Sequence, residues 1–219
     1  MRETGSASQP KLTRPAPAGK PAADLSAGRK LGVDGFVAID FETATASRAS
    51  ACAVALAIVT AGDVTDVRRW LIRPPDNKYD GFNISLHGIT PDMTADSRAM
   101  VEVWPEVVDV VGDRPLVAHY AAFDISVLRA ALATEGGAWP DLVYYCTRAL
   151  SRRAWPGLPS YGLVDIAAEC GITFAHHDPG ADAAVAAELA IACCGAASTR
   201  DLADASRILR VRAGRLSGD

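Results

Sequence analysis

The sequence predicts an α/β fold in which helices pack on a partly antiparallel sheet. Residues 36–43, 51–60 and 64–73 are three consecutive runs with strand character, joined by short turns such as Ala61-Gly62-Asp63. After them, short apolar runs alternate with stretches of helical periodicity. An apolar share of 49% over 219 residues is enough for one domain with a substantial core.

The remaining elements follow from local patterns. A helix is expected near 95–111, where Pro105 either kinks it or restarts it at a first-turn position. The segment "RPLVAHY" (114–120) predicts a short buried strand that runs directly into a helix over 121–134. A further strand is expected at 142–147, and helices near 147–154, 160–169, 179–194 and 200–212.

Composition divides the chain into three parts. Residues 1–33 are rich in Pro, Ala and basic residues without hydrophobic periodicity, which predicts a disordered tail. The domain is expected over 34–195, followed by a C-terminal helix or tail over 196–219. Formal net charge is +4, −10 and +2 in these three parts. An acidic body is unusual for a nucleic-acid protein unless cations neutralise it, and a solvated acidic surface is the alternative.

The compartment is expected to be the cytoplasm. No apolar run approaches the length of a membrane span, and the N-terminus lacks a hydrophobic signal segment, so we expect no membrane association. No cysteine pair has the two-residue gap of a zinc knuckle or redox motif. We therefore expect reduced core thiols at Cys52, Cys146, Cys170, Cys193 and Cys194.

The end of the first predicted strand, "GFVAIDFETAT", carries two acids. Asp40 and Glu42 are two residues apart, so both carboxylates project from one face of the strand, opposite Ile39 and Phe41. Neighbouring carboxylates repel, and their burial is costly without a cation. The pair is either a strand ending in a polar turn or half of a metal site.

Two further acids lie at the starts of predicted helices. Asp124 lies in the first turn after "PLVAHY", and Asp182 begins an apolar stripe with Val185 and Leu189 that faces the interior. Helix N-termini favour acids, so capping is the alternative for each. Asp178, just before a proline, is the expected cap, which leaves Asp182 without a capping role.

A histidine precedes Asp182 by five residues. A loop histidine of this kind is commonly a surface residue. Beside a carboxylate cluster, His177 becomes a candidate general base, because its ordinary pKa of about 6.5 suits neutral pH.

Together, "DFET" (40–43), "VAHYAAFD" (117–124) and "HHDPGAD" (176–182) resemble the three motifs of the DEDDh family of DnaQ-like 3′→5′ exonucleases. That family includes the epsilon subunit of bacterial DNA polymerase III and ribonuclease T. The motifs occur in family order, and His177 and Asp182 meet the H-x4-D spacing. The resemblance extends to "HGIT" (87–90) and covers roughly 34–195.

The resemblance implies a ribonuclease H-like fold with a five-stranded mixed sheet whose second strand is antiparallel. It implies a catalytic role for His177, while His176 would need a longer gap and is expected to point elsewhere. Thr43 and His119 match substrate-contacting positions. The second motif commonly reads His-Asn, but here Tyr120 follows the histidine. The implied metal-binding and catalytic acids are Asp40, Glu42, Asp124 and Asp182.

The implied activity is removal of nucleoside 5′-monophosphates from the 3′ end of DNA. Two divalent ions, Mg²⁺ or Mn²⁺, would be held by the four carboxylates, with Asp40 as the expected bridging ligand. His177 would accept a proton from the attacking water. Arg148 and Arg152, four residues apart on one predicted helix, could meet phosphates or form a solvated face.

Three alternatives remain open on the sequence alone. The same site could trim RNA, as in ribonuclease T or oligoribonuclease. The chain could be a non-catalytic nucleic-acid-binding module, although all five catalytic positions are filled. It could also act as an accessory to a polymerase or as a homo-oligomer, but no polymerase-binding motif is identified.

Overall fold

The computed structural model describes residues 25–139 and 141–217. A six-stranded mixed sheet runs in the order β3-β2-β1-β4-β5-β6. β1 pairs antiparallel with β2 and parallel with β4, which confirms the antiparallel second strand. The strands are β1 (Phe36–Thr43), β2 (Ala51–Thr60), β3 (Asp63–Leu71), β4 (Leu116–Ala118), β5 (Leu142–Cys146) and β6 (Gly214–Leu216).

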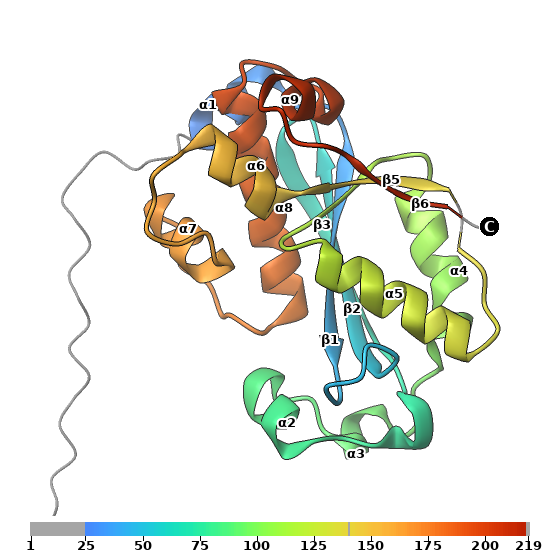
Figure 1. Cartoon of the computed structure of the whole chain (residues 1–219). Helices are drawn as coiled ribbons and strands as arrows, with labels where there is room; N and C mark the ends of the chain where they lie inside the picture. Colours follow the sequence, from blue (N-terminus) through green and yellow to red (C-terminus); the bar gives the residue numbers. More distant parts are fainter. Residues whose placement is uncertain (1–24, 140, 218–219) are drawn as a thin grey trace, which may run out of the picture.

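The helices cover both faces of this sheet. α4 and α5 lie on one side, and α6, α7 and α8 lie on the other (Figure 1). The helices are α1 (Leu25–Leu31), α2 (Gly81–His87), α3 (Pro91–Thr94), α4 (Met100–Val111), α5 (Ala122–Thr134), α6 (Thr147–Ala154), α7 (Leu163–Glu169), α8 (Pro179–Ala196) and α9 (Leu202–Ile208), with a 3₁₀ turn η1 (Pro75–Asn77). The predicted α/β class is confirmed, and the mixed sheet with an antiparallel second strand is the one that the resemblance to a ribonuclease H-like fold implies.

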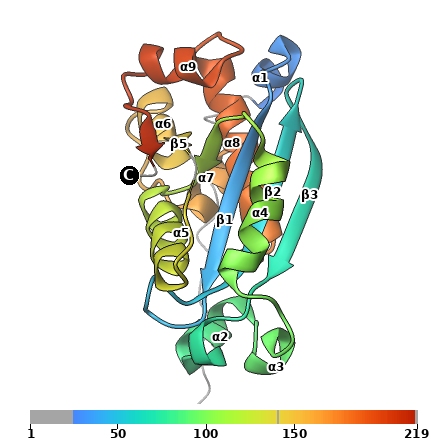
Figure 2. The same ribbon diagram turned by 90° about the vertical axis from the view of Figure 1, so that its right-hand side faces the viewer.

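Alternation along the central strands builds two cores. Val37, Ile39 and Phe41 of β1 pack against α4 and α5, whereas Phe36 and Ala38 face α8. Every β2 residue except the last is buried, because both faces of that strand are covered. Figure 2 shows α4 in front of the β1–β2 pair and α8 behind it.

Helix α8 lies close to the sheet because its inner face is small. Ala183, Ala186, Ala187 and Ala190 are all at most 1% exposed. By length and composition α8 could cross a membrane, contrary to our expectation that no apolar run reaches that length. Its apolar window is 67% buried inside the protein, which is typical of a core helix.

Two parts of the predicted boundaries are wrong. The tail was expected to extend to residue 33, but residues 25–31 form α1, and Val33 is fully buried. Gly28 lets α1 approach α8, because a Cβ there would lie 2.1 Å from the Ile191 carbonyl oxygen. Residues 1–24 lie outside the described part, so the tail prediction is untested there.

At the other end, the terminal helix spans only Leu202–Ile208, and Gly214–Leu216 then adds β6 to the sheet. The sheet therefore has six strands among the described residues rather than five. Pro105 lies within a continuous α4 that begins at Met100, so it does not restart the helix. All five cysteines are free, and four of them are buried.

Candidate active site

The carboxyl ends of the parallel strands β1 and β4 meet at one edge of the sheet. Asp40 and Glu42 lie at the end of β1, and Asp124 lies in the first turn of α5, which follows β4. Asp182 lies in the first turn of α8. All four carboxylates line one cavity of about 400 Å³, and α2, below this edge in Figure 1, closes one side of it.

The carboxylates converge closely. One oxygen from each of Asp40, Glu42 and Asp182 lies within 4.8 Å of the other two. Asp124 is held beside them, because its Oδ1 accepts a hydrogen bond from the Phe41 backbone N–H at 3.1 Å. Asp124 and Asp182 are 2% and 4% exposed. The structure thus gathers all four sequence-predicted acids at one point.

The capping alternative fails for these acids. Asp178 caps α8, since its Oδ1 accepts from the Ala181 N–H at 2.8 Å, as predicted. The Asp182 oxygens instead face the His176 ring and the His177 backbone N–H. The Asp124 carboxylate reaches across to β1, where it accepts the Phe41 N–H. The side chains of Asp124 and Asp182 are therefore available to the cavity that they line.

Burial dominates the electrostatics of the cluster. It is the largest cause that raises the pKa of Asp40 well above its ordinary value, with the Asp124 and Asp182 charges acting in the same direction. Burial also raises the pKa of Glu42 to about 8 and that of Asp124 to about 8. The pKa of Asp182 is raised by burial and lowered in part by its hydrogen bond to His176. Four ionised carboxylates here would be strongly destabilised without a cation.

The donor set fits hard divalent cations. Carboxylate oxygens are the ligands that Mg²⁺ and Mn²⁺ prefer, and no thiol lines the cavity. The negative charge of the clustered carboxylates would attract a divalent cation, and a bound cation would offset their mutual repulsion. Asp40, Glu42, Asp124 and Asp182 are the residues that would hold it.

Two stacked histidines border the cluster. The rings of His176 and His177 are 3.9 Å apart, and both residues line the cavity. His176 was expected to point elsewhere, but its Nδ1 lies 3.2 Å from Asp182 Oδ1. The positive φ of His177, 67°, turns the chain back so that both rings lie beside α8.

The two imidazoles differ in their partners. His176 Nδ1 is engaged by Asp182, whereas the ring nitrogens of His177 have no hydrogen-bond partner among residues 25–139 and 141–217. Burial and the neighbouring His176 lower the pKa of His177 below its ordinary value. His177 is therefore neutral at neutral pH and able to accept a proton from a molecule in the cavity.

The two expected substrate contacts have structural partners already. The Thr43 carbonyl accepts from Asn83 Nδ2 at 2.8 Å and lies 3.2 Å from His87 Nε2. His119 Nδ1 and Nε2 lie 3.0 Å from Thr147 Oγ1 and 3.0 Å from the Tyr161 carbonyl oxygen. Burial lowers the pKa of His119 to about 4. Both residues line the cavity, and the Thr43 Oγ1 also lies 3.4 Å from Asn83 Nδ2.

Sequence reasoning missed three contributors. Asn83 and His87 of α2 hold the end of β1 through the Thr43 carbonyl, and only the "HGIT" segment hinted at one of them. Arg48 lies over the Phe123 ring at 4.1 Å, and its charge lowers the pKa of Asp124, against the larger effect of burial. No local signal in the sequence marks Arg48, because the loop after β1 brings it to the Phe123 ring.

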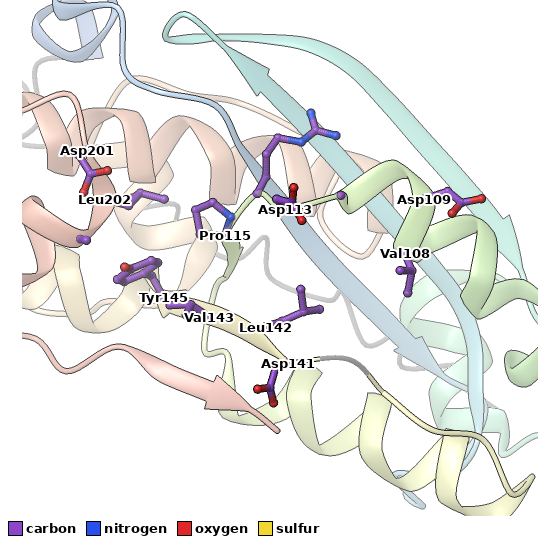
Figure 3. A pocket seen from close by; sticks show the side chains of 13 residues that line it. Val108, Asp109, Asp113, Pro115, Asp141, Leu142, Val143, Tyr145, Asp201 and Leu202 are labelled. Carbon is purple, nitrogen blue, oxygen red and sulfur yellow. The ribbon is translucent and has the colours of Figure 1, made fainter. Parts of the chain in front are cut away.

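A larger cavity, of about 710 Å³, lies at the opposite edge of the sheet (Figure 3). Its lining includes Asp109, Asp113, Asp141 and Asp201. Asp201 caps α9 through the Asp204 N–H at 2.9 Å, and Asp141 pairs with Arg215 at 3.1 Å. This cavity shares no residue with the carboxylate cluster, and two of its acids have structural roles.

Comparison with known proteins agrees with this geometry. The RNase T family model, described as Exonuclease, matches residues 37–190. The chain is 30% identical over 164 residues to the DNA polymerase III subunit epsilon of Aquifex aeolicus, covering 71% of this chain and 78% of that protein. It is 29% identical over 169 residues to a PolC-type DNA polymerase III of Thermotoga maritima, but spans only 12% of that protein.

Solved structures give the same result. Exonuclease X in complex with 5′ overhanging duplex DNA superposes with a TM-score of 0.64 at 25% identity, covering 80% of this chain and 99% of that one. An exonuclease I structure superposes with a TM-score of 0.62 at 16% identity, which supports the fold alone. The resemblance to DnaQ-like exonucleases is confirmed, and the chain belongs to the RNase T exonuclease family.

Proposed function

We propose that the protein is a divalent-metal-dependent 3′→5′ exonuclease that releases nucleoside 5′-monophosphates from DNA. One observation carries the proposal: four carboxylates, two buried and two half-buried, line a single cavity with a neutral histidine whose ring nitrogens have no hydrogen-bond partner among the described residues. Phosphodiester hydrolysis requires such groups, because negative charge must be stabilised on the attacking oxygen, the non-bridging oxygens of the phosphate and the leaving oxygen.

Each residue then has a distinct task. Asp40, Glu42, Asp124 and Asp182 would hold two Mg²⁺ or Mn²⁺ ions. When bound, such ions supply positive charge to the phosphate and lower the pKa of a coordinated water. The Phe41 N–H holds Asp124 at the orientation seen in the structure, and His176 does the same for Asp182.

His177 is the general base in this proposal. Its ring borders the carboxylates, and its lowered pKa keeps it neutral, so it can take a proton from the attacking water. Attack on the terminal phosphodiester breaks the bond to the 3′ oxygen of the preceding nucleotide. The terminal nucleotide then leaves as a 5′-monophosphate.

DNA is the proposed substrate because of the relatives. They include DNA polymerase III proteins and the exodeoxyribonuclease 10 of Escherichia coli, which is 33% identical over 97 residues. RNA is the competing substrate, since the described cavity contains no group that marks a 2′-hydroxyl reader. A DNA polymerase is the macromolecular partner that the same relatives suggest.

The proposal is tested with 5′-labelled DNA and RNA strands, single-stranded, paired and mismatched, in Mg²⁺ or Mn²⁺. We expect a ladder that shortens from the 3′ end of DNA, loss of activity in EDTA, and recovery on metal addition. Undiminished hydrolysis in excess chelator would contradict the metal-dependent mechanism. Faster shortening of RNA would instead assign the protein to RNA trimming.

A further inference from the structure

A second cavity, of about 420 Å³, adjoins the carboxylate cavity. Tyr120 lines both, so the two form a continuous surface around its ring. The second cavity lies between the start of α5, the end of β5, α6 and the segment leading into β6. We call it the arginine groove; its lining is Tyr120, Ala121, Ala122, Tyr144, Cys146, Arg148, Ala149, Arg152, Arg212, Ala213 and Gly214.

The groove has an apolar, aromatic floor. Tyr144 of β5 lies over the backbone of β6, because a Cβ on Gly214 would lie only 2.0 Å from its ring. Tyr120 stands at the border with the carboxylate cavity and is 52% exposed. Two aromatic rings and several alanines thus present flat apolar surface to the cavity.

The rim of the groove is positively charged. Among the described residues, three arginines line it and no acid does. The Arg148 guanidinium lies 5.0 Å from the centre of the Tyr120 ring, and that of Arg152 lies 5.6 Å from the centre of the Tyr161 ring.

None of these three arginines forms an ion pair within the described parts of the chain. In contrast, Arg29, Arg68, Arg69, Arg98, Arg200, Arg207 and Arg215 each pair with an acid. Six other described arginines also form no ion pair, but none of them lines this groove; they are Arg48, Arg73, Arg114, Arg129, Arg153 and Arg210. The three lining arginines therefore give the groove a local positive charge that would attract an anion.

We propose that the arginine groove binds the single strand of DNA upstream of the bond to be cleaved. Phosphates would contact Arg148 and Arg212, and bases would stack on Tyr120 and Tyr144. The alternation of charged rim and aromatic floor matches a strand that carries both phosphates and bases. The continuity at Tyr120 places the occupant next to the carboxylates. This inference rests on the proposed exonuclease function.

The test compares two substrates on the full chain. The 4-nitrophenyl ester of thymidine 5′-monophosphate occupies only the carboxylate cavity, whereas a single-stranded oligothymidylate also reaches the groove. The probe is the double variant Arg148→Gln/Arg212→Gln. The matched control is Arg153→Gln, which lies on α6 beside Arg152, forms no ion pair in the described structure and lines neither cavity.

We expect the double variant to lose about tenfold or more in kcat/KM on the oligonucleotide relative to its loss on the ester. The log–log salt slope of oligonucleotide binding should fall by about 1.4, because each single-strand phosphate contact contributes about 0.7. Arg153→Gln should match the parent protein in both measurements. An equal loss on both substrates, or an unchanged salt slope, would overturn the proposal.

Binding measured without turnover separates this inference from the proposed function. Fluorescence anisotropy of a 5′-labelled oligothymidylate in EDTA reports the groove even if neither substrate is hydrolysed. Weaker binding of the double variant than of Arg153→Gln supports the groove. If the parent protein hydrolyses the ester but binds the oligonucleotide no better than the double variant does, the groove serves another ligand and the inference fails.

Discussion

Two nitrogens of Arg69 lie 2.9 and 2.8 Å from the two carboxylate oxygens of Asp178, so a bidentate ion pair ties β3 to the start of α8. Asp178 directly follows His177 in the chain and also caps α8. Gly180 leaves room for the guanidinium, since a Cβ there would lie 1.9 Å from Arg69 Nε. The pair therefore fixes the loop that carries both histidines.

Loss of this ion pair should affect rate more than stability. The Arg69 and Asp178 side chains are 53% and 37% exposed, so solvent screening limits the pair to about 1 kcal/mol of unfolding free energy or less. A displaced general base is costlier, so Arg69→Gln should lower kcat by about 10- to 100-fold. Urea unfolding and single-turnover nuclease assays measure the two effects. Arg68→Gln, which breaks the neighbouring exposed pair with Asp66, is the control and should leave kcat unchanged.

The carboxylate cluster should destabilise the metal-free protein. Asp40→Asn or Asp182→Asn should abolish activity yet leave the metal-free fold as stable as before or more so, because buried like charges repel. Thermal unfolding in EDTA gives the comparison. A clear drop in Tm for both variants would mean that the acids stabilise the fold rather than serve a metal.

The same cluster predicts a pH dependence. The folded-state pKa of Glu42 is raised from its ordinary 4.5 to about 8, mainly by burial. A raised pKa means that the stabilisation is complete below the unfolded-state pKa and is lost as the pH rises through the folded-state value. The metal-free protein should therefore lose stability between about pH 4.5 and pH 8 through this group.

Glu42→Gln isolates that contribution. In EDTA, the variant's Tm advantage over the parent should grow across this pH range, and addition of Mg²⁺ should shrink it. A difference that stays constant with pH would show that Glu42 does not titrate in this range.

The two histidines should be separable by substitution. The His177 ring lines the cavity and has no hydrogen-bond partner within residues 25–139 and 141–217, so His177→Ala should lose about 10²- to 10⁴-fold in rate. It should retain Mn²⁺ binding, with a weakened rising limb of the pH–rate profile. His176 contacts Asp182, so His176→Ala should lose less and mainly require more metal for half-maximal activity. Metal titrations of activity for both variants test this assignment. The reverse result would make His176 the general base.

The backbone conformation of Tyr120 should lower the stability of the fold. Its φ of 64° lies in the left-handed region, which costs a bulky residue about 1–2 kcal/mol, whereas asparagine tolerates it. Tyr120→Asn should therefore be more stable than Tyr120→Ala by about 1 kcal/mol, since both lose the ring but only Asn suits the backbone. Chemical unfolding of the three proteins measures the difference. Equal stability of the two variants would show that the backbone relaxes when the ring is removed.

Local patterns in the sequence determined much of this protein. The alternation in "GFVAIDFETAT" placed Asp40 and Glu42 on one strand face, and the α8 stripe turned Asp182 inward, both as observed. These features follow from the two-residue strand repeat and the 3.6-residue helix repeat. The order of the three motifs, and the spacing between His177 and Asp182, then identified the candidate site through the family resemblance.

Other features depended on contacts between distant segments, which no local pattern records. The seven-residue α1, with Gly28 in its middle, is too short and too weak in propensity to form alone. It is held by packing on α8 and by the ion pairs of Arg29 with Glu188 and Asp63. β6 exists because Gly214 fits under Tyr144 at the sheet edge.

The tertiary structure also decided how the neighbours of the site are used. The spacing in the sequence predicted that His176 would point away from the site. In the structure, the turn at His177 stacks the two rings and places His176 Nδ1 within hydrogen-bond distance of Asp182. Tyr120 and Arg212 meet at one groove only because β6 returns beside β5. Sequence periodicity determines which face a residue occupies within its own element. Long-range pairing of strands and packing of helices determine which other residues that face meets, because those contacts depend on the whole chain.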